Sequence, residues 1–370
     1  MKVLLTPDKF KGSLSAQEVC AALEKGLKRA NPNVTIVSRP LADGGDGSLE
    51  ILGHYLELKT QSLQVQDPLG RPIFADYKIA RNTAYIEMSM ASGLVLLKPE
   101  ERNCMYTSSF GTGELIADSL TRRVKEIYLF IGGSATNDGG IGIAQALGYR
   151  FYDVSGNLLK PTGENLSRID KIDDSEVRVE LKEVPVHLVC DVNNPFWGEN
   201  GAAYVYAAQK GANTHEIALL DQGLKNLADC LVKHSFPDVA HIPGAGAAGG
   251  VGGGCIAFLH ADLISGIQTF LKIAELEKLI QDSDLVITGE GKLDAQTENG
   301  KVVSGVCELA QKYDVPVIAV CGAADEKAAE KLPIQQIYTV LSRSISIEEA
   351  MTKAAEKLEA IALDILNTNI

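Results

Sequence analysis

Short apolar runs, separated by longer amphipathic stretches, occupy both ends of the chain. Apolar residues dominate positions 3–5, 34–37, 285–287, 315–320 and 337–341. Runs of this length between polar loops are typical of strands buried on both faces of a parallel sheet. Helical periodicity instead marks the stretches 16–30, 302–313 and 347–366. The pattern predicts an α/β domain in which helices cover both faces of a five-stranded parallel sheet.

The middle of the chain has a different pattern. Between residues 58 and 90 the apolar runs are short and are interrupted by turn-forming residues, which favours a hairpin or meander over a βαβ unit. Strands follow at 127–131 and 186–190. We therefore expect one domain formed by residues 1–60 and 275–370, and a second, mixed-sheet α/β domain, residues 61–274, inserted into it. Small ligands commonly bind between domains, so we expect the active site in the inter-domain cleft.

The first strand leads into a loop that carries Asp8, Lys9 and Lys11. Ser15 and Glu18 then have the capping-box spacing that marks the start of a helix. Helix N-termini attract anions, and phosphate chemistry uses fixed positive charge together with a carboxylate for a metal or a proton. We therefore favour a functional loop over the alternative of a solvated charged turn.

Acidic loops follow two other strands of the same predicted sheet. Asp43 and Asp46 lie among glycines after the second strand, and Mg²⁺ prefers a few such oxygen ligands together with water and phosphate. A type I′-like turn is the alternative for an Asp-Gly sequence, but helical spacing follows here, which favours a βα loop. Glu290 and Asp294 follow the strand at 285–287 and are candidates to orient a metal or a substrate.

The strand at 127–131 runs into a loop that contains Gly132, Gly133, Ser134, Thr136 and Asn137. Glycines allow a ligand to approach the backbone closely, and the hydroxyl and amide side chains can bind it. The alternative is a sharp turn in which Asn137 caps a helix.

Two more loops of the middle region are candidates. Asp191 follows the strand at 186–190, and Asn193 points to the same side if the chain stays extended. Residues 244–249 match GxGxxG, but a poor preceding strand and the missing acidic partner exclude a dinucleotide fingerprint. Gly246 and Gly249 are then explained either by phosphate or substrate binding or by close helix packing.

Composition excludes several classes of function. A formal net charge of -13 argues against a nucleic-acid partner and against an anionic membrane surface, and no apolar stretch reaches membrane-spanning length. The 7 cysteines form no CxxC pair, so we expect free thiols in a reducing cytoplasm. The dispersed histidines do not predict a zinc site. Neither a P-loop nor the protein-kinase signatures are present.

Nine sequence blocks follow one another along nearly the whole chain. They are PDKFKGSLS (7–15), ADGGDG (42–47), DPLGR (67–71), GGSATNDG (132–139), CDV (190–192), NP (194–195), QKGA (209–212), GAGAAGG (244–250) and ITGEG (287–291). In this order they resemble the bacterial glycerate kinases that form 2-phosphoglycerate. The resemblance implies a flavodoxin-like domain made of both chain ends with a second α/β domain inserted. It also implies transfer of the γ-phosphoryl group of ATP to D-glycerate with Mg²⁺.

The chain departs from the family pattern in two places. Asp46 and Ser48 stand where glutamate and threonine are commoner, which preserves the charge and the hydroxyl. Phe196 and Trp197 follow the NP block where a leucine is commoner, and this change could alter the edge of the pocket.

For this reaction we expect Asp191 to act as general base, with Asp8 as the second choice, because deprotonating an alcohol needs a carboxylate within hydrogen-bond reach. Lys9 or Lys11 would neutralise the phosphoryl group or the substrate carboxylate, and Asp43 would ligate Mg²⁺ with Asp46. The expected substrate- and phosphate-binding residues are Lys9, Ser13, Gly132, Gly133, Ser134, Thr136, Asn137, Asn193, Gly246, Gly249, Glu290 and Asp294.

Three alternatives stay open at this point. The enzyme could form 3-phosphoglycerate, or the same loops could serve a non-catalytic sensor that binds a nucleotide or a small acid. A hydride-transfer enzyme is a weaker hypothesis because the dinucleotide fingerprint is incomplete. The apolar face of the C-terminal helix could mediate a homodimer, although such faces more often cover a sheet.

Overall fold

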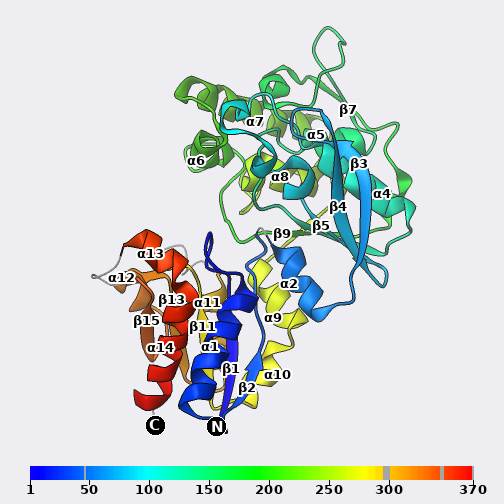
Figure 1. Ribbon diagram of the computed structural model, residues 1–370. Coiled ribbons are helices and arrows are strands. Elements are labelled where there is room, and N and C mark those ends of the chain that lie inside the picture. Colours follow the sequence, from blue (N-terminus) through cyan, green and yellow to red (C-terminus); the bar gives the residue numbers. More distant parts are fainter. Residues whose placement is uncertain (46, 295–300, 342–345, 369–370) are drawn as a thin grey trace. The chain divides into compact units, whose positions relative to one another are not determined.

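The structure is a computed structural model that describes residues 1–45, 47–294, 301–341 and 346–368 (Figure 1). Its contacts divide the chain into two units. Unit 1 consists of Met1–Asp43 and Ser265–Ile370, and unit 2 consists of Gly44–Ile264. None of the helices in the described ranges is long and apolar enough to cross a membrane.

Unit 1 is built on an all-parallel, five-stranded sheet with the order β15-β13-β11-β1-β2, which confirms the predicted fold class. Its strands are β1 (Lys2–Pro7), β2 (Thr35–Ser38), β11 (Leu285–Gly289), β12 (Lys292–Leu293), β13 (Val317–Cys321), β14 (Ala323–Ala324) and β15 (Gln336–Thr339). Its helices are α1 (Ala16–Ala30), α9 (Gly266–Ile273), α10 (Leu276–Gln281), α11 (Val302–Gln311), α12 (Glu326–Ala329), α13 (Ile347–Thr352) and α14 (Ala354–Thr368). The short strands β12 and β14 pair with each other outside the main sheet.

Helices α1 and α14 pack side by side (Figure 1) and share one apolar cluster with the sheet. The predicted capping box at the start of α1 is present: the Ser15 hydroxyl oxygen accepts the Glu18 N–H, and the Glu18 carboxylate accepts the Ser15 N–H. The C-terminal stretch, expected to be one helix, is divided at Lys353 into α13 and α14. The apolar face of α14, including the buried Leu358 and Ile365, belongs to this cluster, so it covers the sheet of its own unit.

Unit 2 contains a mixed six-stranded sheet with the order β10-β9-β6-β5-β4-β3. The strands of the unit are β3 (Lys59–Gln66), β4 (Pro72–Ala80), β5 (Thr83–Glu87), β6 (Glu126–Phe130), β7 (Arg150–Tyr152), β8 (Lys171–Asp173), β9 (Val186–Val189) and β10 (Asp262–Ile264). Strands β7 and β8 pair with each other outside the six-stranded sheet. The α-helices of the unit are α2 (Ser48–Tyr55), α3 (Ser89–Ser92), α4 (Phe110–Thr121), α5 (Ile141–Ala146), α6 (Ala202–Tyr206), α7 (Thr214–Lys233) and α8 (Ala247–Leu259). Its 3₁₀ helices are η1 (Leu94–Leu96), η2 (Pro99–Glu101), η3 (Gly163–Arg168), η4 (Val179–Lys182) and η5 (Ala208–Lys210).

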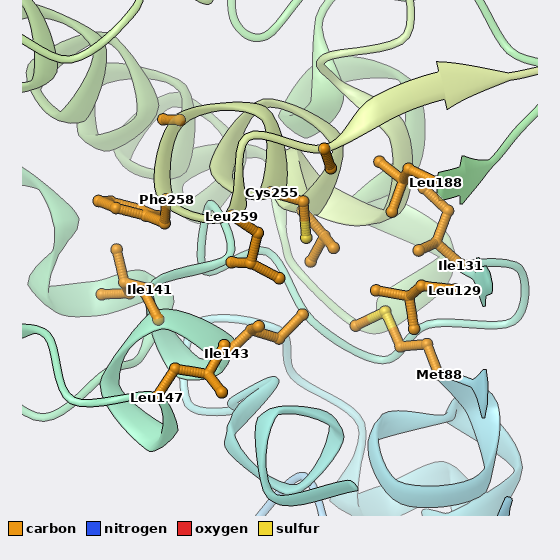
Figure 2. Close-up of a cluster of buried hydrophobic side chains, with 14 of the residues drawn as sticks. Met88, Leu129, Ile131, Ile141, Ile143, Leu147, Leu188, Cys255, Phe258 and Leu259 are labelled. Atoms are coloured by element: carbon orange, nitrogen blue, oxygen red, sulfur yellow. The ribbon is translucent and has the colours of Figure 1, made fainter. Parts of the chain in front are cut away.

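Strands β3, β4 and β5 form the predicted meander, and β5, β6, β9 and β10 run parallel. The apolar core of the unit lies between this sheet and helices such as α5 and α8. Figure 2 shows Ile141 and Ile143 of α5 opposite Phe258 and Leu259 of α8. The loops that follow β6 and β9 are therefore anchored to a rigid, close-packed frame.

The unit boundaries lie at different residues from those we expected. Helix α2 groups with unit 2, where the backbone N–H of Leu49 donates to the buried carboxylate of Glu87 at the end of β5. Helix α9 groups with unit 1, where Ile267 lies so close to Gly305 of α11 that a Cβ added to that glycine would be only 2.6 Å from it. Both helices belong with the partners against which they pack.

Candidate functional site

The strand order of unit 1 places a topological switch point between β1 and β11. From β1 the chain passes to β2 on one side, and the later strand β11 pairs on the other side. Ligands of open parallel sheets bind at such a point, outside the carboxyl ends of the strands. Pro7 pairs with Gly289 in the register of β1 and β11, so Asp8 and Glu290 both leave the sheet there.

The carboxyl group of Asp8 is crowded by other acidic groups. It is only 8% exposed, and its Oδ1 accepts the backbone N–H of Lys9 at 2.7 Å. Burial raises the pKa of Asp8 to about 7, with a further increase from the charge of Asp43 and a smaller one from that of Glu290. The structure thus brings three of the predicted acidic residues into electrostatic contact.

The other predicted acidic residues differ in their surroundings. Glu290 is 5% exposed, and the Lys301 ammonium lies 4.0 Å from its carboxylate. Asp294 is half-buried and lies 3.3 Å from the Lys292 ammonium. Asp46 lies outside the described residues. In the part of the chain that the structure describes, no group of three acidic, histidine or cysteine side chains has a metal-binding arrangement.

The predicted cationic loop is a closed turn. The N–H of Phe10 donates to the Leu14 carbonyl and the N–H of Leu14 to the Phe10 carbonyl, while the Phe10 ring is buried. Lys9 is half-buried and Lys11 is exposed. The Ser13 hydroxyl donates a hydrogen bond to the carbonyl oxygen of Met351 in α13 at 2.6 Å. This contact ties the turn to α13, so Ser13 has a structural role besides the phosphate contact that we predicted.

In unit 2, many neighbours fix the loop that follows β6. The backbone of Ala135 donates to the Ser92 carbonyl, and its own carbonyl accepts the Thr107 hydroxyl. Asp138 is fully buried, which raises its pKa, and it accepts hydrogen bonds from both the N–H and the hydroxyl of Ser109. Asp138 and Ser109, absent from the predicted set, therefore position the predicted Asn137.

Lys210, which appeared in the sequence analysis only as part of the QKGA block, also holds this loop. Its ammonium donates to the Ser134 hydroxyl oxygen at 2.7 Å and to the Thr136 carbonyl at 2.8 Å. Nearby, the Thr136 hydroxyl and both polar atoms of the Asn137 amide are buried and have no hydrogen-bond partner among the residues that the structure describes. Ser134, Thr136 and Asn137 were all predicted, and the first two contact one buried lysine.

Asp191 lies two residues beyond the end of β9, Gly132 and Gly133 follow β6, and Glu87 ends β5. These three strands are parallel neighbours, so their carboxyl ends lie at one edge of the unit 2 sheet. Asp191 is half-buried and Asn193 is exposed. The sheet edge therefore gathers the predicted residues of unit 2.

The GxGxxG glycines pack closely against neighbouring backbone. A Cβ on Gly246 would meet the Pro195 carbonyl oxygen at 2.2 Å, and one on Gly249 would meet the Thr136 carbonyl oxygen at 2.1 Å. Phe196 is fully buried, and its ring lies against Gly250 and Gly253 of α8. The packing explanation thus accounts for these glycines, and ligand binding by Gly246 and Gly249 stays a prediction. Phe196 fills the core of unit 2.

The thiol prediction is confirmed. All seven cysteines are free, and all but the partly exposed Cys190 are buried. Burial raises the pKa of the buried Cys104, Cys255 and Cys321 thiols, so they stay protonated and inert near neutral pH.

Comparison with known proteins identifies relatives over the full length. Residues 3–369 match the model of the glycerate kinase family. The chain is 41% identical to the glycerate kinase of Halalkalibacterium halodurans over 367 residues, which cover 98% of this chain and 97% of that protein. It is also 41% identical to the glycerate 2-kinase of Escherichia coli over 362 residues, 97% of this chain and 95% of that one.

A solved structure has the same architecture. The crystal structure described as glycerate kinase 2 from Salmonella typhimurium LT2 superposes with a TM-score of 0.86 at 38% sequence identity. The match covers 100% of this chain and 98% of that one. The resemblance found in the nine sequence blocks therefore extends to the whole fold.

Proposed function

Because the chain belongs to the glycerate kinase family, we propose that it transfers the γ-phosphoryl group of ATP to D-glycerate and forms 2-phosphoglycerate. The choice of product is supported by the similarity to a protein named glycerate 2-kinase. Phosphoryl transfer depends mainly on positioning and on charge stabilisation, so the proposal must account for both from the residues of this chain.

The crowding of Asp8, Asp43 and Glu290 at the switch point carries this proposal. Burial and the charges of Asp43 and Glu290 raise the pKa of Asp8, so this cluster favours an added positive charge. The oxygen donor set fits Mg²⁺, which is commonly held by one or two carboxylates while water and phosphate oxygens complete its shell. Asp43, with Asp46, would hold the ion, which when bound neutralises charge on the phosphoryl oxygens.

The cationic turn supplies the fixed charge. Lys11 is exposed and Lys9 half-buried on a turn tied down by Phe10 and Ser13, next to the carboxylates that would hold the metal. We assign Lys11 to the transferring phosphoryl group. Glu290 and Asp294 orient the groups around it.

The unit 2 edge supplies the groups for the acceptor. Asp191 accepts the proton of the attacking hydroxyl, with Asp8 as the second candidate. Ser134, Thr136 and Asn137 bind the acid. The inter-domain cleft that would unite these groups with the cationic turn stays a prediction. The free thiols fit the reducing environment of a cytoplasmic enzyme.

The test is an assay of the purified protein with MgATP and D-glycerate, in which ³¹P NMR identifies the position of the new phosphate. A 2-phosphoglycerate signal with glycerate-dependent ADP release is expected. A 3-phosphoglycerate signal would correct the regiochemistry, and nucleotide binding without turnover would favour a sensor. Omitting Mg²⁺ should abolish turnover.

Variants assign the role of the turn. Lys11→Ala should lower kcat by orders of magnitude while the fold survives, because its side chain is exposed. Lys278→Ala removes an exposed lysine on α10 and is the matched control. Near-normal turnover of Lys11→Ala would remove Lys11 from the mechanism.

A further inference from the structure

Lys210 is a buried cation whose hydrogen-bond partners among the described residues are uncharged. Its side chain is 3% exposed, and it forms no ion pair with any of the described residues. The Asp138 carboxylate contributes at longer range, but its oxygens already accept hydrogen bonds from the Ser109 hydroxyl and from backbone N–H groups. A buried charge of this kind opposes folding unless something else compensates it.

The neighbouring polar atoms also have unused hydrogen-bonding capacity. The Thr136 hydroxyl, the Asn137 amide nitrogen and the Asn137 amide oxygen are buried, and no described residue forms a hydrogen bond with them. Nearly all buried polar groups in proteins are hydrogen-bonded. A charged group and three unsatisfied atoms on adjacent residues therefore indicate that a polar ligand completes this cluster.

Ser134 connects this cluster to the surface. Its Oγ accepts a hydrogen bond from the Lys210 ammonium. The hydroxyl proton of Ser134 must therefore point elsewhere, and no described residue accepts it. Ser134 is 7% exposed and follows Gly133, which is exposed and has φ +69°. The hydroxyl is thus held with its proton available at the open end of the loop.

We infer that Lys210 is a positioning residue for the carboxylate of the hydroxy-acid substrate, acting through the hydroxyl of Ser134. The ammonium fixes the Ser134 rotamer and adds positive charge behind a hydroxyl that donates to the carboxylate. Asn137 and Thr136 offer donors and an acceptor for the hydroxyls of the acid. This inference rests on the proposed function, and it leaves Lys9 and Lys11 to the phosphoryl group.

Two single variants and their combination test this inference. Lys210→Met keeps an unbranched side chain at the buried position and removes the charge. Ser134→Ala removes the hydroxyl through which Lys210 acts. Each should raise the KM for D-glycerate roughly 10- to 100-fold, the range for a lost hydrogen bond to a charged group, and leave the KM for ATP unchanged. The double variant should resemble the single ones, because one interaction is lost in all three. Lys182→Met, at an exposed lysine in the same unit, is the control.

Binding is measured as well as turnover, by calorimetric titration of D-glycerate into the full-length protein. An unchanged glycerate KM in Lys210→Met would overturn the inference. So would additive effects in the double variant, or equal losses for both substrates together with a lowered Tm, since these describe a purely structural link between loops. If the wild-type protein fails to phosphorylate glycerate, the proposed function fails instead, which separates the two outcomes.

If Lys210→Met does not fold, the inference is tested by Ser134→Ala and by the pH dependence of the wild-type KM for glycerate. Burial lowers the pKa of Lys210 to about 8, and Cys104 and Asp138 oppose that effect. The Cys104 thiol has a pKa raised to about 11, so among these groups Lys210 titrates first above neutral pH. The KM for glycerate should rise above about pH 8 while the KM for ATP stays flat. A glycerate KM that is constant up to pH 9.5 would refute the inference.

Discussion

Gly249 lies where the backbone of α8 closely approaches the loop that follows β6, and replacing it by alanine tests two explanations of the GxGxxG sequence. Its φ is +71°, and an added Cβ would lie 2.1 Å from the Thr136 carbonyl oxygen and 2.6 Å from the Asn137 Cα. Packing therefore predicts a large loss of stability. A phosphate clamp predicts a loss of nucleotide binding without one.

The magnitude follows from two terms. A non-glycine residue in the left-handed conformation costs about 1–2 kcal/mol, and overpacking that displaces backbone costs about 1–3 kcal/mol. Gly249→Ala should therefore lower the free energy of unfolding by about 2–5 kcal/mol. Gly156 is the matched control, because its φ is +80° but nothing lies within 4 Å of an added Cβ. Gly156→Ala should lower the free energy of unfolding only by the cost of the left-handed backbone conformation.

Trp197 makes the measurement specific to unit 2, because it is the single tryptophan of the chain and lies in that unit. Urea unfolding followed by its fluorescence gives the free energy of unfolding of the two variants and the wild type. Equal losses of unfolding free energy in Gly249→Ala and Gly156→Ala would refute the packing argument. Equal losses combined with a raised KM for ATP only in Gly249→Ala would favour the phosphate clamp.

Three further predictions concern stability. Ser15→Ala should lower the stability of unit 1 by about 1 kcal/mol, because the capping box of α1 is lost; circular dichroism during denaturation measures it. Asp67→Ala should cost about 2–3 kcal/mol, because the buried carboxylate accepts hydrogen bonds from Leu69 and Arg71; Trp197 fluorescence in urea measures it, and a loss below 0.5 kcal/mol would contradict it. The free energy of unfolding should rise between about pH 8 and 10.5, because the lowered pKa of Lys210 makes the unfolded chain bind more protons than the folded one there. Across this range the wild type should gain on the order of 3 kcal/mol of stability relative to Lys210→Met. Urea unfolding of both proteins at a series of pH values measures this difference.

The sheet of unit 1 was predictable because its strands are buried on both faces. Such strands are continuous apolar runs, and the polar residues that follow them, Asp8 and Glu290, mark the carboxyl edge. The capping box of α1 was predictable because its two side chains interact locally. Helix α7 has buried leucines at positions 220, 224, 227 and 231, so its periodicity was present in the sequence, although it was not among the predicted elements.

Other features depend on tertiary contacts that no local pattern encodes. The QKGA block is typical of an exposed loop, yet Lys210 is buried because η5 turns its side chain beneath the loop that follows β6. The assignment of α2 to unit 2 depends on the contact between Leu49 and Glu87, residues far apart in sequence. The left-handed backbone at Gly249 is equally invisible until its neighbours are known.

The two units maintain charge arrangements that folding alone disfavours, and the arrangements are of opposite sign. In unit 1, Asp8 is buried beside other carboxylates, and burial and their charges raise its pKa. In unit 2, Lys210 has no ion-pair partner among the described residues, and burial lowers its pKa. Replacing such groups by apolar ones is often neutral or stabilising in proteins, so stability does not account for their presence. A metal-bound nucleotide offers a cation to carboxylates, and a hydroxy acid offers an anion to the buried lysine. The electrostatics of each unit therefore match one of the two substrates of the proposed reaction.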